Sequence, residues 1–332
     1  MYNILCTGGC GFIGHNVLEY LTLKYQERMF INYDKLDYCS CLPENIKAKN
    51  HIFVKGDITD KKSILNTLNQ YGITHVIHFA AHTHVDNSFG NSIDFTMTNV
   101  LGTHTLLECC KEYGKIQKFL HFSTDEVYGE VTLNAEGCTE KAFLNPTNPY
   151  AASKASAEMI CMAYIKSFDS PIVVLRCNNA YGKGQYPEKL IPKFISLLHN
   201  NEKCTIHGDG MTRRNFIHTN DIASAVDVVF QKGGIGDTYN IGSCNEFNVL
   251  DVTKMLVNVM KPNEDLKDWI EHVNDRNFND YRYAVDCEKL KELGWEESTD
   301  FQESLQKTIE WYTQLLDLKK KYWVKDGLYK LE

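Results

Sequence analysis

Short apolar runs alternate with stretches of helical periodicity along the first half of the chain. The apolar runs predict six buried strands, at 2–8, 29–34, 51–57, 74–81, 118–123 and 171–177. The stretches between them predict helices at 14–25, 60–71, 93–113 and 150–168. Nearly continuous apolar strands that alternate with helices are typical of a parallel sheet covered on both faces. We therefore expect an α/β fold built on a doubly wound parallel sheet.

The second half of the chain has a less regular pattern. It predicts helices at 187–200, 220–231, 248–260 and 286–314, and a strand at 238–242. We expect a first domain over 1–177, to which 210–245 contributes and shares its sheet, and a smaller, mostly C-terminal α/β domain over 178–318. The run KLKELGW (289–295) suggests a small helical lid, and the charged, amphipathic tail 319–332 is expected to be exposed or poorly ordered.

Composition narrows the class of protein. The chain has 332 residues, is 43% hydrophobic and 23% charged, and carries a net charge of −8, which argues against a nucleic-acid-binding protein. No apolar run approaches the roughly 20 residues of a membrane helix, and no secretory signal precedes the first strand. None of the 12 cysteines forms a C-x-x-C pair, so we expect free thiols and a cytoplasmic protein.

A glycine-rich turn follows the first strand directly and opens a helix. In TGGCGFIG (7–14), Gly8, Gly11 and Gly14 allow the backbone to approach a pyrophosphate at the helix N-terminus. Asp34 ends the second strand, where a carboxylate accepts hydrogen bonds from a ribose 2′-hydroxyl and repels a 2′-phosphate. This arrangement predicts a Rossmann fold that binds NAD rather than NADP.

Two further patterns carry candidate chemistry. Tyr150 and Lys154 are four residues apart on a predicted helix and share a face, so the ammonium is expected to lower the pKa of the phenol. The run HFSTDEVYG (121–129) places Asp125 and Glu126 at the end of an apolar strand. Regular alternation would direct them to opposite faces, so a shared site requires the strand to end at this point.

The glycine loop, Asp34 and the Tyr150/Lys154 pair together resemble the extended short-chain dehydrogenase/reductase family of nucleotide-sugar enzymes. The resemblance places Thr124 next to the substrate hydroxyl. It implies that the cofactor is bound by Gly8, Gly11, Phe12, Ile13, Gly14, Asp34, Lys35, Asp37, Asp57, Ile58, Ala80, Ala81, Thr83, Asn99, Tyr150 and Lys154.

The run STDEVYG narrows the resemblance to nucleotide-diphosphate-glucose 4,6-dehydratases, together with NNAYG (178–182), PEKLIP (187–192), GDG followed by Arg214, and YNIG (239–242). In that family C4 is oxidised, water is eliminated across C5 and C6, and the hydride returns to C6. The resemblance assigns the O4 proton to Tyr150, supported by Thr124 and Lys154, the C5 proton to Glu126 and protonation of the C6 hydroxyl to Asp125. Because neighbouring carboxyls hinder each other's ionisation, we expect this pair to hold one proton near neutral pH.

The resemblance also implies substrate contacts. These are His84, Thr124, Asn179, Lys189, Leu190, Arg214, Asn248, Arg276 and Asn279. The runs DKLDYCS (34–40), THVDNSFGNS (83–92) and DRNFNDYRYAVD (275–286) resemble UDP-glucose 4,6-dehydratases and the dehydratase domain of UDP-rhamnose synthases. This favours UDP-glucose over dTDP-glucose and implies deoxysugar (rhamnose-type) biosynthesis, in which the 4-keto-6-deoxy product could become rhamnose or another deoxysugar.

Other functions are compatible with parts of the pattern. A UDP-sugar 4-epimerase needs the glycine loop and Tyr150/Lys154 but not the carboxylate pair, and a non-catalytic NAD-binding scaffold needs none of the reactive residues. His82, His84 and Asp86 could suggest a metal site, with both histidines on one strand face, but no fourth ligand is apparent and we expect no metal. Relatives usually form homodimers through helices at 93–113 and 150–168, and a separate epimerase/reductase is expected to act on the product.

Overall fold

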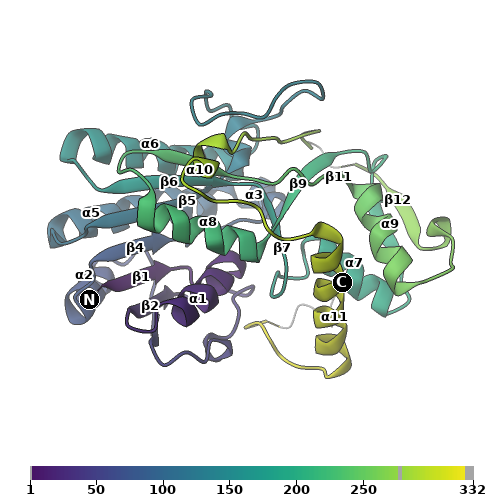
Figure 1. The fold of residues 1–332 in the computed structure, drawn as a ribbon, viewed down its shortest axis with the longest axis horizontal. Helices are drawn as coiled ribbons and strands as arrows, with labels where there is room; N and C mark the ends of the chain where they lie inside the picture. The colour runs from purple at the N-terminus through teal and green to yellow at the C-terminus, as the bar shows by residue number, and fades with distance from the viewer. Residues whose placement is uncertain (1, 276–278, 326–332) are drawn as a thin grey trace.

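The computed structural model describes residues 2–275 and 279–325 (Figure 1). Its strands are β1 (Asn3–Thr7), β2 (Met29–Asp34), β3 (His51–Lys55), β4 (His75–His78), β5 (Lys118–Thr124), β6 (Ile172–Cys177), β7 (Asn179–Tyr181), β8 (Cys204–His207), β9 (Arg213–His218), β10 (Thr238–Ile241), β11 (Glu246–Asn248) and β12 (Ile270–Val273). Its α-helices are α1 (Phe12–Lys24), α2 (Lys61–Tyr71), α3 (Val85–Gly90), α4 (Ser92–Phe95), α5 (Thr103–Tyr113), α6 (Pro149–Phe168), α7 (Leu190–His199), α8 (Thr219–Lys232), α9 (Val249–Met260), α10 (Glu288–Lys291) and α11 (Phe301–Asp317). The 3₁₀ helices are η1 (Pro43–Asn45), η3 (Asp125–Tyr128) and η4 (Leu266–Asp268), and η2 (Thr96–Gly102) is a π-helix.

The central sheet has seven parallel strands in the order β10-β6-β5-β4-β1-β2-β3. All six strands predicted in the first half belong to it. β10 comes from the second half and pairs with β6, which confirms that the two halves share one sheet.

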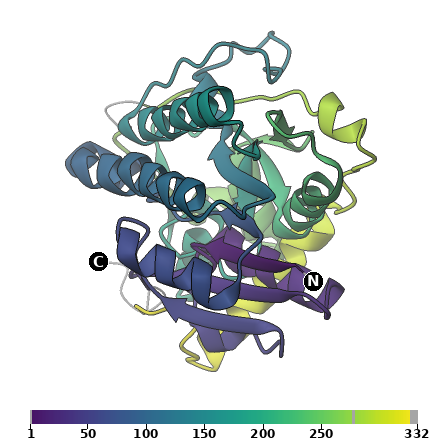
Figure 2. The ribbon, with the colours of Figure 1, turned by 90° about the vertical axis from the view of Figure 1, so that its left-hand side faces the viewer.

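Helices cover both faces of this sheet, as Figure 2 shows from one end. Apolar side chains of α1 and α8, such as Leu18 and Val226, form one core with the first face. Side chains of α2, α5 and α6, such as Leu68, Leu106 and Cys161, form a second core with the opposite face. The doubly wound α/β fold predicted from the alternation of strands and helices is thus confirmed.

A smaller part of the chain packs beside the sheet, at the right of Figure 1. It contains a three-stranded sheet (β11-β9-β7) and a two-stranded sheet (β12-β8), covered by α7, α9 and α11. Its own apolar core includes Phe194, Leu256 and Leu305.

One expectation about the second half was wrong, and another holds for only part of the tail. The KLKELGW run forms no lid, because Leu290 and Trp295 are buried in the core beneath α8, and residues between α10 and α11 are not helical. In the tail, Lys319–Lys321 and Lys325 are exposed as expected, whereas Trp323 is only 1% exposed and pairs with Cys41; residues 326–332 lie outside the described residues. Over the described residues, no helix has both the length and the apolar character needed to span a membrane.

Candidate active site

A cavity of about 520 Å³ opens over the carboxyl ends of the central strands. Its wall includes Gly8 after β1, Lys35 after β2, Phe79 after β4 and Asp125 after β5. Loops that leave the carboxyl edge of a parallel sheet diverge there and leave a crevice, which is the usual ligand site of such folds.

The glycine turn is packed too closely for side chains. A Cβ on Gly8, whose φ is +69°, would lie 2.4 Å from the backbone nitrogen of Ala80. A Cβ on Gly14 would lie 2.4 Å from the carbonyl oxygen of Gly8. With Gly11 also on the cavity wall, the turn presents bare backbone at the N-terminus of α1, which fits the pyrophosphate of a dinucleotide.

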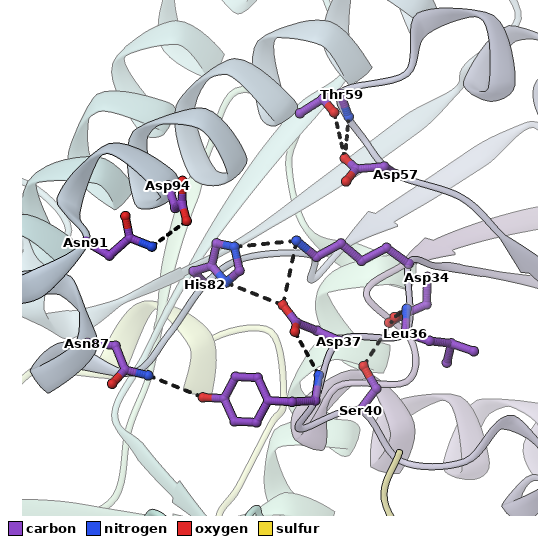
Figure 3. A network of polar contacts seen from close by, with 12 residues as sticks. Asp34, Leu36, Asp37, Ser40, Asp57, Thr59, His82, Asn87, Asn91 and Asp94 are labelled. Atoms are coloured by element: carbon purple, nitrogen blue, oxygen red, sulfur yellow. Dashed lines mark hydrogen bonds and ion pairs between the residues drawn. The ribbon is translucent and has the colours of Figure 1, made fainter. Parts of the chain in front are cut away.

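Asp34 holds this turn against the end of β2. Its carboxylate accepts a 3.0 Å hydrogen bond from the backbone nitrogen of Cys10. It accepts another, of 2.8 Å, from the backbone nitrogen of Leu36 (Figure 3). Burial raises the pKa of the carboxyl, and these bonds oppose that effect. Asp34 lines the cavity, as expected for a residue that meets a ribose.

Lys35 and Asp37 form a polar cluster with His82 at the edge of the cavity (Figure 3). Lys35 Nζ lies 3.6 Å from Asp37 Oδ2 and 3.4 Å from His82 Nε2. Asp57 also lines the cavity, where it accepts hydrogen bonds from Thr59, and Ile58 lies beside it. These predicted cofactor contacts therefore gather on one wall.

The segment after β4 forms another part of the wall. Ala80, Ala81 and Thr83 line the cavity, whereas the side chain of Asn99 lies behind them. Asn99 accepts a 2.8 Å hydrogen bond from the backbone nitrogen of His82 and donates one of 3.0 Å to its carbonyl oxygen. The structure thus gives Asn99 a supporting position, although it was predicted among the cofactor contacts.

Strand β5 ends at Thr124, and Asp125 and Glu126 begin the 3₁₀ helix η3. Regular alternation therefore stops at the carboxylate pair, and both residues line the cavity. Asp125 accepts a 2.6 Å hydrogen bond from Asn178 Nδ2 and one of 3.2 Å from Thr124 Oγ1. The strand therefore ends where the shared site requires it, and the catalytic roles of the pair stay a prediction.

Two asparagines that hold the carboxylates were missed by sequence reasoning. Asn178 bonds Asp125, and Asn148 donates a 3.0 Å hydrogen bond to Glu126 Oε2. Asn178 belongs to the NNAYG run, but only its neighbour Asn179 was selected. Asn148 also caps α6 by accepting from the backbone nitrogen of Ala151, a role that the NPY sequence could have indicated.

The environment raises the pKa values of both members of the pair. Burial, and then the charge of Glu126, raises the pKa of Asp125 to about 7. Burial also raises the pKa of Glu126, while Asn148, Arg214 and Lys189 oppose the shift. Both directions agree with a pair that retains a proton near neutral pH.

Tyr150 and Lys154 lie on the first turns of α6, and both line the cavity. Burial, and then the charge of Glu126, raises the pKa of Tyr150, whereas its hydrogen bond with Thr124 lowers it. Burial lowers the pKa of Lys154 to about 8, and Lys154 Nζ donates a 2.6 Å hydrogen bond to the carbonyl oxygen of Phe122. The predicted lowering of the Tyr150 pKa was therefore wrong for the protein alone, because burial and the nearby carboxylates raise it.

Three predicted substrate contacts lie on the far wall of the cavity: His84, Asn179 and Lys189. Lys189 Nζ donates a 3.2 Å hydrogen bond to the carbonyl oxygen of Thr83 and so bridges the two walls. Asn179 Oδ1 and Ser123 Oγ are buried and have no hydrogen-bond partner within the described part of the chain. Unpaired polar atoms on a cavity wall suit a polar ligand.

The remaining predicted contacts occupy other positions. Leu190 begins α7, and Asn248 caps α9 by accepting a 2.7 Å hydrogen bond from the backbone nitrogen of Asp251. Arg214 donates to the carbonyl oxygen of Asp280, at 2.9 Å, and to Asn279 Oδ1, at 3.3 Å. These four residues do not line the cavity, and Arg276 lies outside the described residues. Their contact with substrate stays a prediction.

The histidines considered as metal ligands lie beyond β4, in a segment that is not a strand, so the shared strand face was wrong. His82 is part of the Lys35 cluster, and His84 caps α3. Within residues 2–275 and 279–325, no three His, Cys, Asp or Glu side chains are grouped to hold a metal ion.

The doubly wound sheet, the glycine cradle, Asp34 and the Tyr150/Lys154 pair define an extended short-chain dehydrogenase/reductase of the nucleotide-sugar group. Residues 5–308 match the family described as GDP-mannose 4,6 dehydratase, so the chain belongs to that family.

Two relatives and one solved structure show which kinds of family member the chain is similar to. It is 43% identical over 364 residues to dTDP-D-glucose 4,6-dehydratase of Dictyostelium discoideum, which covers 97% of this chain and 83% of that protein. It is 48% identical over 317 residues to a trifunctional UDP-glucose 4,6-dehydratase/3,5-epimerase/reductase of Arabidopsis thaliana, which covers 94% of this chain but only 47% of that protein. The crystal structure of dTDP-glucose 4,6-dehydratase from Bacillus anthracis in complex with NAD matches with a TM-score of 0.87 and 39% identity, over 96% of this chain and 98% of the other.

Proposed function

We propose that this protein is an NAD-dependent hydro-lyase that converts a nucleotide-diphosphate-glucose to its 4-keto-6-deoxy derivative. The observation that carries the proposal is the buried Asp125/Glu126 pair in the same cavity as Tyr150 and Lys154. The family supplies the reaction, and this pair distinguishes a dehydratase from an enzyme that only oxidises and reduces C4. The same pair argues against a UDP-sugar 4-epimerase and a non-catalytic scaffold.

The cofactor site follows from the glycine cradle and Asp34. Bound as NAD⁺, the cofactor supplies the hydride acceptor for C4 and a positive ring that favours the phenolate of Tyr150. The bare backbone of Gly8, Gly11 and Gly14 would hold its pyrophosphate, and Asp34 would accept from a ribose hydroxyl.

The chain's own residues then divide the proton transfers. Tyr150 takes the proton of O4, with Thr124 bonded to its hydroxyl and Lys154 on the next turn of α6. Glu126 takes the C5 proton, which the C4 ketone makes acidic. Asp125, whose pKa of about 7 leaves it largely protonated under mildly acidic conditions, delivers a proton to the C6 hydroxyl so that water can leave.

We infer that the nucleotide is UDP. The support is the resemblance of DKLDYCS, THVDNSFGNS and DRNFNDYRYAVD to UDP-glucose dehydratases, although relatives that act on dTDP-glucose are also close in sequence. The test is to incubate the purified protein with UDP-glucose and dTDP-glucose separately and to measure the 4-keto product of each. A higher kcat/KM for UDP-glucose is expected, and equal values would remove the preference.

The division of labour between the two parts of the chain is also proposed. The larger part, from 1–177 with 210–245, would bind NAD, and 178–318 would supply most of the nucleotide-sugar site.

A 4-keto-6-deoxy product would need a further epimerase/reductase activity, of the kind named in the Arabidopsis relative. Free cysteines throughout the described residues support a cytoplasmic location.

A homodimer is proposed through the helices between Ser92 and Tyr113 and helix α6. Their outward faces expose apolar side chains, namely Ile93, Met97, Leu101, Met159 and Met162. Several exposed apolar side chains on neighbouring helices suit burial against a second copy. Light scattering of the purified protein should give twice the mass of the chain, and a monomer would contradict this.

A further inference from the structure

The chain after α11 returns to the larger part of the molecule and lies along the loop that follows β2 (Figure 1). We call residues 322–325 the strap. The backbone nitrogens of Val324 and Lys325 donate hydrogen bonds to the carbonyl oxygens of Ser40, at 2.8 Å, and Tyr38, at 3.0 Å. In return, Leu42 donates a 2.9 Å hydrogen bond to the carbonyl oxygen of Tyr322. The strap therefore runs antiparallel to the 38–42 loop and pairs with its backbone as a short strand would.

The loop beneath the strap belongs to the cofactor wall of the cavity. Tyr38, Cys39 and Ser40 line the cavity, and Ser40 Oγ donates a 3.4 Å hydrogen bond to Asp34. The next residue, Cys41, donates a 2.7 Å hydrogen bond to the carbonyl oxygen of Cys10 in the glycine turn. The strap thus supports two segments that would meet the cofactor, although none of its residues lines the cavity.

Trp323 connects the strap to the opposite wall. Its indole Nε1 donates a 3.0 Å hydrogen bond to the carbonyl oxygen of Gly184, and its ring stacks on Tyr312 of α11. Gly184 immediately precedes Gln185 and Tyr186, which line the sugar-side wall together with Glu188 and Lys189. Only 1% of Trp323 is exposed, so this link is protected from water.

A second link joins the two walls close to the strap. Tyr38 Oη donates a 2.8 Å hydrogen bond to Glu188 Oε2, directly between the two walls. The walls are therefore joined by Tyr38 and Glu188 as well as through Trp323. Opening the cavity at this place would have to break both links, in addition to the bond of Lys189 described above.

We propose that the strap, through Trp323 and the backbone of Val324, is a positioning element that keeps NAD bound through repeated turnovers. It does so by holding the 38–42 loop and the 184–189 loop at a fixed separation. The inference rests on the proposed use of NAD and adds to it a determinant of cofactor retention that lies outside the cavity.

The test compares the rate of cofactor release in matched variants. The Val324→Pro variant loses the backbone donor to Ser40, whereas Val324→Ala keeps it. The Trp323→Phe variant loses the donor to Gly184. Its control, Trp269→Phe, removes an indole donor that bonds Glu264, and neither of these residues lines the cavity. Each protein is loaded with fluorescent etheno-NAD and chased with excess NAD, and the melting temperature of each cofactor-free protein is measured alongside.

Release should be at least about threefold faster in Val324→Pro and Trp323→Phe than in their matched controls, the factor expected for one lost hydrogen bond. Equal release rates within each pair, with only the melting temperature lowered, would overturn the proposal and leave the strap a purely structural element. If Val324→Pro does not fold, the Trp323→Phe comparison decides. A parent protein that binds no NAD would overturn both this inference and the proposed function, whereas one that retains NAD but does not dehydrate the sugar contradicts the proposed function alone.

Discussion

Asn178 donates a 2.6 Å hydrogen bond to Asp125 and thereby joins the segment after β6 to the segment after β5. The bond favours the ionised carboxylate, while burial and Glu126 favour the protonated acid. The outcome is a pKa of about 7, which is useful for a group that must donate a proton near neutral pH. Asn178 is therefore foremost among the groups that lower the pKa of the acid of the proposed reaction, ahead of Thr124 and Arg214.

Replacing Asn178 with Ala should raise the pKa of Asp125 further, because a bond to the charged form is lost. Activity that needs protonated Asp125 declines as pH rises through this pKa, so the alkaline limb of the pH profile should move upward from about 7. The measurement is kcat for formation of the 4-keto product between pH 5 and about 10, a range that extends to both sides of the Asp125 pKa. Asn69→Ala, on the exposed face of α2, is the control, and an alkaline limb that does not move in Asn178→Ala would contradict the assignment.

Replacing Asp125 with Asn should lower kcat at least about a hundredfold, since the amide cannot protonate the leaving hydroxyl. The substitution should also change how stability depends on pH. The folded state of the parent binds the Asp125 proton more tightly than the unfolded chain, so this group lowers stability as pH rises from its ordinary value of 3.8 to about 7. Melting temperatures across that range should fall less steeply in Asp125→Asn, and unaltered turnover would exclude Asp125 as the acid.

Replacing Glu126 with Gln should abolish exchange of the C5 proton with solvent. The amide cannot accept this proton, although C4 oxidation by Tyr150 and Lys154 should persist. In deuterium oxide, the parent should place deuterium at C5 of the product, and the variant should instead accumulate reduced cofactor without a dehydrated sugar. Glu27→Gln, with an exposed side chain, is the control, and normal deuterium uptake in Glu126→Gln would remove Glu126 from its role.

The parts of this site that depend on local sequence were predictable, and the parts that depend on distant contacts were not. The period of apolar residues located the strands, and the glycine turn and the Tyr150/Lys154 spacing located the cavity because each pattern spans only a few residues. Asn178 and Trp323 contact Asp125 and Gly184 across 53 and 139 positions, and no local pattern indicates such a pairing. The charged run Lys319–Lys321 is exposed, as its composition favours, but the insertion of the Trp323 side chain into the core depends on distant contacts that the composition of the tail does not indicate.

Replacing Gly8 with Ala should prevent NAD binding. The new Cβ would lie 2.4 Å from the backbone of Ala80, and the φ of +69° is strained for any other residue. Gly90 is the matched control, because a Cβ there meets no atom within 4 Å. Absorbance of bound cofactor in the purified proteins should be lost in Gly8→Ala and retained in Gly90→Ala, and full cofactor content in both would contradict the proposed cradle.

Breaking the buried ion pair between Glu158 and Arg176 should destabilise the protein far more than breaking an exposed one. Arg176 Nη2 lies 2.7 Å from Glu158 Oε2, and the side chains are only 5% and 1% exposed. In Glu158→Gln the guanidinium keeps its charge without a counter-ion, which costs about 3–5 kcal/mol in comparable buried pairs. Glu303→Gln breaks the exposed pair with Lys307 and should leave the free energy of unfolding, measured with urea, almost unchanged. Equal losses of stability in the two variants would show that the Arg176 charge is compensated by other groups, of which Tyr128, at 2.7 Å, is the nearest candidate.

Glu158 also acts on Lys154, which lies one turn earlier on α6, because the charge of Glu158 favours the ammonium. The Glu158→Gln substitution should therefore also lower the pKa of Lys154 below about 8 and reduce C4 oxidation at neutral pH.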